Sequence, residues 1–262
     1  MSERRPAEQQ HRQHPAPRRA SRRHRRTRTY RPAHSAARAL CLAAVGLGIV
    51  FWQRADAVGR GVVPGRPSLS HTPSEARGRL VPPPPAGPLG PEGVPIPAAP
   101  ALAGPGQAAL GARIDGIPCG TIEQLAFHVH AHLTIFVSGA QRRVPAGVGI
   151  GSPRTIEPTL RGTFVTGGTC FSWLHTHAAD GVIHIESPVR RTFTLGDFFD
   201  VWGQRLGSRR LGSTTGRVTA FLDGRHYVGN PRNIPLPGHA QIQVDIGRPT
   251  VAPALVRFPQ GL

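Results

Sequence analysis

The chain has 262 residues but contains no lysine, only one methionine and only three cysteines. Its 32 basic residues are therefore all arginine, and they face just 14 acidic residues. With Met1 as its only methionine, the chain is poorly equipped for a Cu(I) site that relies on thioether ligands. No C-x-x-C pair is present either, so the sequence gives no support to a thioredoxin-like redox function.

The formal charge of +18 is concentrated in the first 38 residues, which hold twelve arginines against only Glu3 and Glu8. Residues 111–262, by contrast, contain fifteen arginines and nine acids. Basic residues that precede an apolar segment stay in the cytoplasm and set its orientation in the membrane. We therefore interpret residues 1–38 as a basic, disordered cytoplasmic arm and expect no nucleic-acid partner. Binding of DNA, RNA or anionic lipid by this arm is the alternative.

The longest apolar run covers residues 39–52 and is followed by Gln53 and Arg54. A membrane-spanning helix usually needs about 20 apolar residues, so this run is short for a span. We expect residues 39–54 to form a single-pass membrane anchor. The alternative is a cleaved signal peptide, because Ala55-Asp56-Ala57 forms an A-x-A site. Both interpretations place the C-terminal part outside the cytoplasm, at the cell membrane or, after cleavage behind Ala57, as a secreted protein.

The composition then divides the rest of the chain. Residues 55–110 are rich in proline and glycine and have no sustained apolar period, so we expect a disordered linker. Residues 111–247 are expected to form one β-rich extracytoplasmic domain, and residues 248–262 a tail. Within the domain, Cys119 and Cys170 form an even pair, which in an oxidising compartment favours a disulfide contributing about 3–4 kcal/mol. A free, metal-binding thiol is the alternative.

Hydropathy patterns predict several strands and one helix in the domain. Residues 127–137 alternate with period two, and residues 170–177, 182–187, 218–222, 225–228 and 241–246 also have strand character. Leu195, Phe198, Phe199 and Trp202 have helical spacing, preceded by Thr194 as N-cap with Asp197 three residues later. The expected fold is mainly β (α+β): an antiparallel sandwich or partly open barrel with one packed helix.

Six of the thirteen histidines lie between positions 128 and 184. Five of them are spaced two residues apart, at 128, 130 and 132 and at 175 and 177. In a strand, residues two apart point to the same face, about 6.7 Å from one another, so an H-x-H pair can direct two imidazoles at one ion. We predict a metal site for a divalent transition metal, Zn or Cu(II), built from His128, His130, His132, His175, His177 and His184. The alternatives are a solvated edge strand or histidines bonded to backbone groups.

Long motifs in the same region resemble those of a family of uncharacterised bacterial exported proteins. They are Phe-His-Val-His-Ala-His-Leu at 127–133, Val-Pro-Ala-Gly-Val-Gly-Ile at 144–150, Trp-Leu-His-Thr-His-Ala-Ala-Asp-Gly-Val-Ile-His-Ile-Glu-Ser-Pro at 173–188, and Phe-Thr-Leu-Gly-Asp-Phe-Phe-Asp-Val-Trp-Gly at 193–203. The resemblance implies export but no particular activity. His175-Thr176-His177 is also similar to the H-T-H copper ligands of ascorbate-dependent copper monooxygenases, which in addition use a methionine.

Three functions are compatible with these patterns. The first is a membrane-anchored module that binds a divalent metal. The second is a metal-dependent hydrolase or oxidoreductase in which Glu186 or Asp180 moves protons. The third is a metal-free structural or interaction domain. The sequence alone leaves open whether the protein is an enzyme.

Overall fold

A computed structural model of the chain describes residues 79–262. The predicted arm at 1–38, the predicted anchor at 39–54 and the first part of the predicted linker lie outside the described residues. Within the described part of the chain, no helix is both long enough and apolar enough to cross a membrane.

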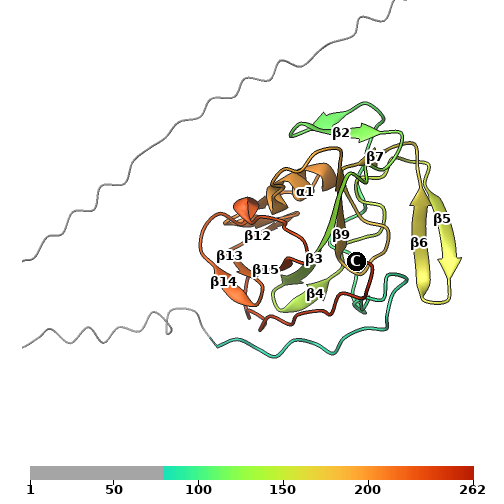
Figure 1. Cartoon of the computed structure of the whole chain (residues 1–262). Coiled ribbons are helices and arrows are strands. Elements are labelled where there is room, and N and C mark those ends of the chain that lie inside the picture. The colour runs from blue at the N-terminus through green and yellow to red at the C-terminus, as the bar shows by residue number, and fades with distance from the viewer. Residues whose placement is uncertain (1–78) are drawn as a thin grey trace, which may run out of the picture. The chain divides into compact units, whose positions relative to one another are not determined.

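The described residues form a mainly β fold with one α-helix, which confirms the predicted fold class (Figure 1). The strands are arranged in several sheets without forming a closed barrel. The elements are β1 Arg113–Ile114, β2 Ile117–Gly120, β3 Phe127–Val137, β4 Ala140–Arg142, β5 Thr155–Thr159, β6 Gly162–Gly167, β7 Phe171–Ser172, β8 Leu174–His175, β9 Val182–Ser187, α1 Leu195–Trp202, β10 Leu206–Gly207, β11 Arg210–Leu211, β12 Thr214–Thr215, β13 Val218–Leu222, β14 Arg225–Tyr227, the 3-10 helix η2 Pro231–Asn233, and β15 Gln241–Ile246.

The main sheet has the strand order β14-β13-β15-β3-β9-β8, with β4 paired to the end of β3. Besides β4, its central strand β3 pairs with two further strands, one on each part of its length. Residues 127–132 pair antiparallel with β9, whereas residues 132–137 pair parallel with β15. The parallel pair is a feature that the sequence did not predict. All the other strand pairs of this sheet are antiparallel.

One face of this sheet forms the apolar core together with α1. The alternating residues Ala131, Leu133 and Ile135 of β3 are buried in the same cluster as the helix residues Phe198 and Trp202. The helix begins with the predicted capping box, in which the Thr194 side chain accepts from the Asp197 backbone and Asp197 accepts from the Thr194 backbone. It ends at Gly203, whose left-handed conformation closes the last turn.

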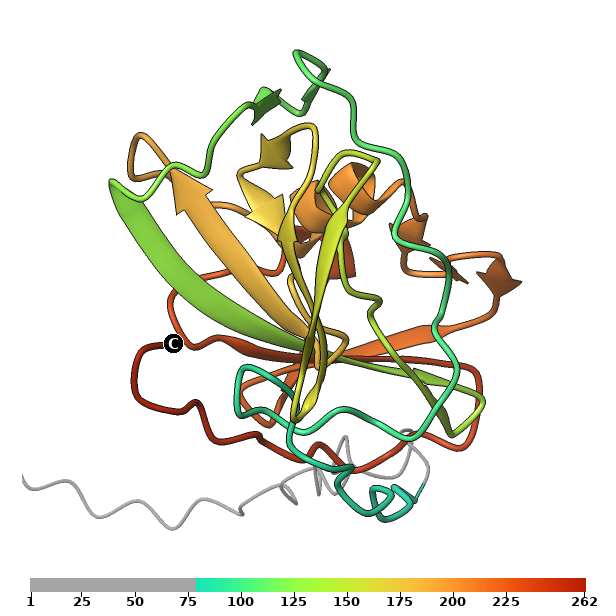
Figure 2. The same ribbon diagram turned by 90° about the vertical axis from the view of Figure 1, so that its right-hand side faces the viewer.

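The histidines of β3 and β9 lie on the opposite face of the sheet, since they alternate with the core residues of these strands. Two segments outside the predicted domain, residues 79–110 and 248–262, pack against this sheet, and Figure 2 shows their course. Val81 pairs with Val251, and the Gln243 side chain donates to the Val251 carbonyl. Residues 79–110 therefore pack on the domain, with Val94 fully buried, and this corrects the prediction of a disordered linker for that stretch. The proline and glycine residues of this stretch interrupt any apolar period, but the stretch still packs against the face of the sheet. The predicted tail also packs here.

Two smaller features flank the sheet. Cys119 and Cys170 form the predicted disulfide, which ties β2 to the segment that leads into β7. The β5–β6 hairpin projects from the rest of the domain, with every residue of β5 exposed. At the base of this hairpin the Val165 backbone N–H donates to the His177 carbonyl, and the His177 ring donates through Nδ1 to the Val165 carbonyl. The hairpin therefore contacts the histidine-bearing face.

Candidate metal centre

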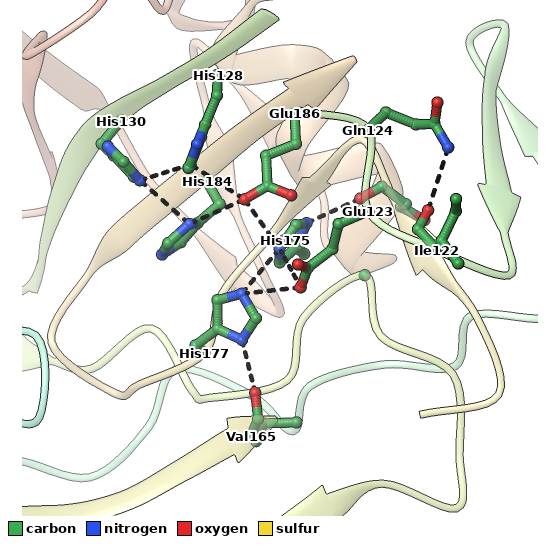
Figure 3. A network of polar contacts seen from close by, with 12 residues as sticks. Ile122, Glu123, Gln124, His128, His130, Val165, His175, His177, His184 and Glu186 are labelled. Carbon is green, nitrogen blue, oxygen red and sulfur yellow. Dashed lines mark hydrogen bonds and ion pairs between the residues drawn. The ribbon is translucent and has the colours of Figure 1, made fainter. Parts of the chain in front are cut away.

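Three neighbouring strands bring five of the six predicted histidines together. In the register of β3 and β9, His130 lies opposite His184 and His128 lies opposite Glu186. On the other side of β9, His175 of β8 also lies opposite His184. Because paired residues of adjacent strands point to the same face, these side chains converge (Figure 3). The parity argument from the sequence thus led to the correct face for these residues.

Backbone carbonyls of the segment 144–150 accept hydrogen bonds from residues on both sides of β8. Ser172 donates to the Gly149 carbonyl, Thr176 donates to the Val148 carbonyl, and the Thr176 hydroxyl donates to the Pro145 carbonyl. A Cβ on Gly149 would lie 2.3 Å from the Leu174 carbonyl oxygen, so the close approach requires glycine at this position. These contacts fix the backbone that presents His175 and His177.

His175 and His177 form the clearest ligand pair. The Nδ1 atom of His175 lies 2.9 Å from the Ser172 carbonyl oxygen, and that of His177 lies 2.6 Å from the Val165 carbonyl oxygen. A carbonyl can only accept, so each Nδ1 carries the proton and each neutral ring has a free lone pair on Nε2. The two Nε2 atoms lie 3.0 Å apart. Two lone pairs at this distance repel one another unless a cation lies between them.

The distance itself matches a shared ion. Two nitrogens that are each about 2.0–2.1 Å from one ion lie about 3–3.4 Å apart at angles near tetrahedral or somewhat smaller. The backbone carbonyls act as the hydrogen-bonding partners that commonly orient metal-binding imidazoles. This pair therefore has both the spacing and the tautomers that metal coordination requires.

A second set of donors is formed by His128, His130, His184 and Glu186. The Nε2 atoms of His128 and His130 are 3.0 Å apart, and His130 Nε2 lies 3.2 Å from His184 Nδ1. Glu186 Oε1 lies 3.1 Å from His128 Nε2 and 3.3 Å from His184 Nδ1. His128 is the exposed member, whereas the other three side chains are buried. Solvent therefore reaches the cluster from the His128 side.

Two further carboxylates complete the site, and neither was predicted. Glu92, from the segment 79–110, lies with Oε1 2.6 Å from His184 Nε2. Glu123, from the loop between β2 and β3, lies with Oε1 3.4 Å from His177 Nε2 and 3.8 Å from His175 Nε2. Both lie in segments without hydropathy periodicity. The only signal for Glu92 was that it is the single acid between residues 79 and 110.

Burial keeps several of the imidazoles neutral. It lowers the pKa of His130 to about 3, with further lowering by His184 and His128. Burial also lowers the pKa of His175 well below its usual range, and that of His177, again with His184 contributing next. Burial and the nearby Glu186 raise the pKa of Glu123. Neutral imidazoles with available lone pairs are the form in which histidine binds metals.

His184 behaves differently because it lies between two carboxylates. Burial alone would lower its pKa, but hydrogen bonds to Glu186 and Glu92 outweigh burial and raise the pKa to about 9. A positive charge is thus favoured at the centre of the cluster. In the metal-free chain the proton on His184 supplies that charge.

His132 and Asp180 lie apart from these groups. His132 Nε2 lies 2.9 Å from the Asp180 carbonyl oxygen, and burial lowers the pKa of His132 to about 4. The register explains its position, since β9 begins at Val182, opposite His132, and has no histidine there. Asp180 Oδ1 accepts from the Val182 backbone in the turn, and burial raises the pKa of Asp180 to about 8. The structure therefore does not bring His132 together with the other predicted ligands.

The strand predicted at 170–177 is interrupted. Phe171 and Ser172 pair with β2, whereas Leu174 and His175 pair with β9. Trp173, at the break, packs edge-on against Phe193 and against the apolar core. His177 lies beyond β8, but its ring centroid remains 4.6 Å from that of His184.

The described residues thus contain two groups of donors that could hold a metal ion. One comprises His175, His177, His184 and Glu186, and the other comprises His128, His130 and His184. Within each group the ligand atoms lie within 4.8 Å of one another. The fold and the site define a mainly β domain with a buried histidine–carboxylate cluster on one sheet face. A scan against protein-family models, a search of curated proteins and a search of solved structures find no match to this chain.

Proposed function

We propose that this protein is an extracytoplasmic metal-binding protein that holds a divalent transition metal, Zn(II) or Cu(II), through the imidazoles of β3, β8 and β9. The observation that carries the proposal is the His175–His177 pair, whose Nε2 lone pairs face each other at 3.0 Å while both Nδ1 protons are held by backbone carbonyls. Imidazole ligands suit both metals.

The extracytoplasmic location rests on two observations. The Cys119–Cys170 disulfide is typical of proteins in oxidising compartments. The apolar run at 39–52, outside the described residues, has the composition of an anchor or of the apolar part of a signal peptide. The resemblance of the histidine motifs to those of exported bacterial proteins is consistent with this location.

The geometry favours binding over catalysis. Glu186, the candidate proton carrier, lies among three imidazoles at 3.1–3.9 Å, in the position of a ligand. Asp180, the other candidate, is used by its own turn and lies in neither donor group. Neither acid is therefore placed beside the donors as a free general base.

The test uses the purified full-length chain and the His184→Ala variant, because His184 belongs to both donor groups. We expect the wild type to retain Zn(II) or Cu(II), and a chelator to lower its melting temperature. A ligand at 100 times its Kd stabilises by about 2.7 kcal/mol, which corresponds to about 5–10 °C for a domain of this size. The variant should bind at least tenfold more weakly, whereas His239→Asn, at an exposed position, should bind as the wild type does.

A wild-type chain that takes up neither metal and melts at the same temperature with and without chelator would refute the proposal. That result would instead support the metal-free structural or interaction domain.

A further inference from the structure

The cluster holds more donors than one ion can use. Five imidazoles and three carboxylates meet on this face, whereas a tetrahedral site takes four ligands. The eight side chains are those of Glu92, Glu123, His128, His130, His175, His177, His184 and Glu186. Glu92 contacts the Nε2 atom of His184 and orients that ring. Seven side chains therefore remain as possible metal ligands.

The two histidine pairs also fall into different groups of donors. Each pair has its Nε2 atoms 3.0 Å apart, and of the two groups formed by the described residues one holds His128 and His130 and the other holds His175 and His177, with His184 in both. A tetrahedral ion that takes one pair and His184 has room for only one further ligand. Such an ion therefore leaves the facing lone pairs of the other pair uncompensated.

Glu186 lies between the two pairs. Its Oε1 atom lies 3.1 Å from His128 Nε2 on one side and 3.9 Å from His175 Nε2 on the other. Its second oxygen, Oε2, is buried and accepts no hydrogen bond from any described residue. A buried carboxylate oxygen without a partner carries a substantial desolvation cost, which a cation would offset.

We propose that the cluster is a two-metal centre in which the Glu186 carboxylate is shared between two divalent ions. His128, His130 and His184 hold one ion, and His175 and His177, with Glu123 beside them, hold the other. The strand β9 supplies both central residues, Glu186 and His184. Its neighbour β3 supplies one histidine pair, and β8 with the residues that directly follow it supplies the other. This inference rests on the proposed metal-binding function and specifies its stoichiometry.

The experiment measures metal content of the full-length chain after stripping with a chelator and reloading with Zn(II). We expect two equivalents for the wild type and two for the control His239→Asn. The double variants His128→Ala/His130→Ala and His175→Ala/His177→Ala should each retain one equivalent.

One equivalent in the wild type would overturn the two-metal centre while leaving the proposed metal-binding function intact. No metal in the wild type would overturn both. Two equivalents that are both lost when either pair is removed would also contradict two separately held ions, provided that circular dichroism shows the variant to be folded.

A second measurement on the wild type does not depend on any variant folding. Loaded with Cu(II), a carboxylate-bridged pair should show magnetic coupling in its electron paramagnetic resonance spectrum, with a half-field signal or loss of intensity relative to the copper bound. A spectrum of isolated Cu(II) ions that accounts for all the bound copper would refute the shared ligand.

Discussion

Replacing Glu92 by glutamine should weaken metal binding at His184 by about 10- to 100-fold. Glu92 Oε1 lies 2.6 Å from His184 Nε2, and the Glu92 side chain is only 5 % exposed. The carboxylate holds the proton on Nε2, so the metal displaces the proton on Nδ1, which faces His130 and Glu186. Carboxylates that orient a metal-binding histidine in this way typically contribute 10- to 100-fold to affinity.

Glutamine has the same shape and can still accept from Nε2 through its own oxygen, so the change removes charge and leaves the packing intact. The expected loss corresponds to about 1.4–2.7 kcal/mol of binding free energy. Competition with a chromophoric chelator on the full-length chain measures it directly. Glu157→Gln, at an exposed position of β5, is the matched control and should bind as the wild type does. A Kd for Glu92→Gln within twofold of the wild-type value would refute this role of Glu92.

Three other outcomes follow from particular side chains. Burial raises the pKa of Asp245 to about 6 from 3.8, so ionising it disfavours the folded state. In urea titrations the unfolding free energy of the wild type relative to Asp245→Asn should fall by about 2 kcal/mol from pH 4 to pH 7, and a constant difference would contradict this. Gly149→Ala should lower the melting temperature by more than Gly203→Ala does. Both glycines have positive φ, but only at Gly149 would a Cβ meet the Leu174 carbonyl. Equal losses of about 1 kcal/mol of unfolding free energy in the two variants would show that the clash relaxes. His132→Gln should leave metal affinity in the chelator competition unchanged, since His132 lies in neither donor group, and a tenfold loss would place it in the site.

The elements with strong local patterns were predictable from the sequence. The period-two alternation of residues 127–137 matches β3 at both ends, and the capping box at Thr194 marks the start of α1. These features depend on a residue and its close neighbours in the chain. The H-x-H parity likewise assigned the histidine pairs to one face, because side-chain direction in a strand is a local property.

The partners across the sheet could not be predicted in the same way. The parallel pairing of β15 with β3 joins strands about a hundred residues apart, and no local pattern encodes it. Its consequence is visible at His132, which has the same parity as His128 and His130 but lies opposite the first residues of both β9 and β15. The shared parity of the three histidines correctly predicted their common face. It wrongly predicted that His132 would lie beside the other ligands.

Glu92 and Glu123 were missed for a related reason. Each lies in a segment whose position is determined by what it covers rather than by its own periodicity. The proline-rich stretch around Glu92 has the composition of a linker, yet it lies along the sheet and pairs with the C-terminal segment at Val81 and Val251. Carboxylates that complete a site from such covering segments become visible only once the fold is known.

The sheet places the apolar core on one face and the proposed metal-binding side chains on the other. The apolar face of β3 packs through Leu133 and Ile135 against the cluster that contains α1, while the imidazoles lie on the opposite face. Removing a ligand therefore leaves the main core untouched, and the chain should remain folded while its metal affinity falls. The buried cluster would still gain from occupancy, because the facing Nε2 lone pairs and the unpaired Glu186 oxygen are compensated by a cation. For these reasons, loss of metal with retained circular dichroism is the result that distinguishes a ligand from a core residue in this protein.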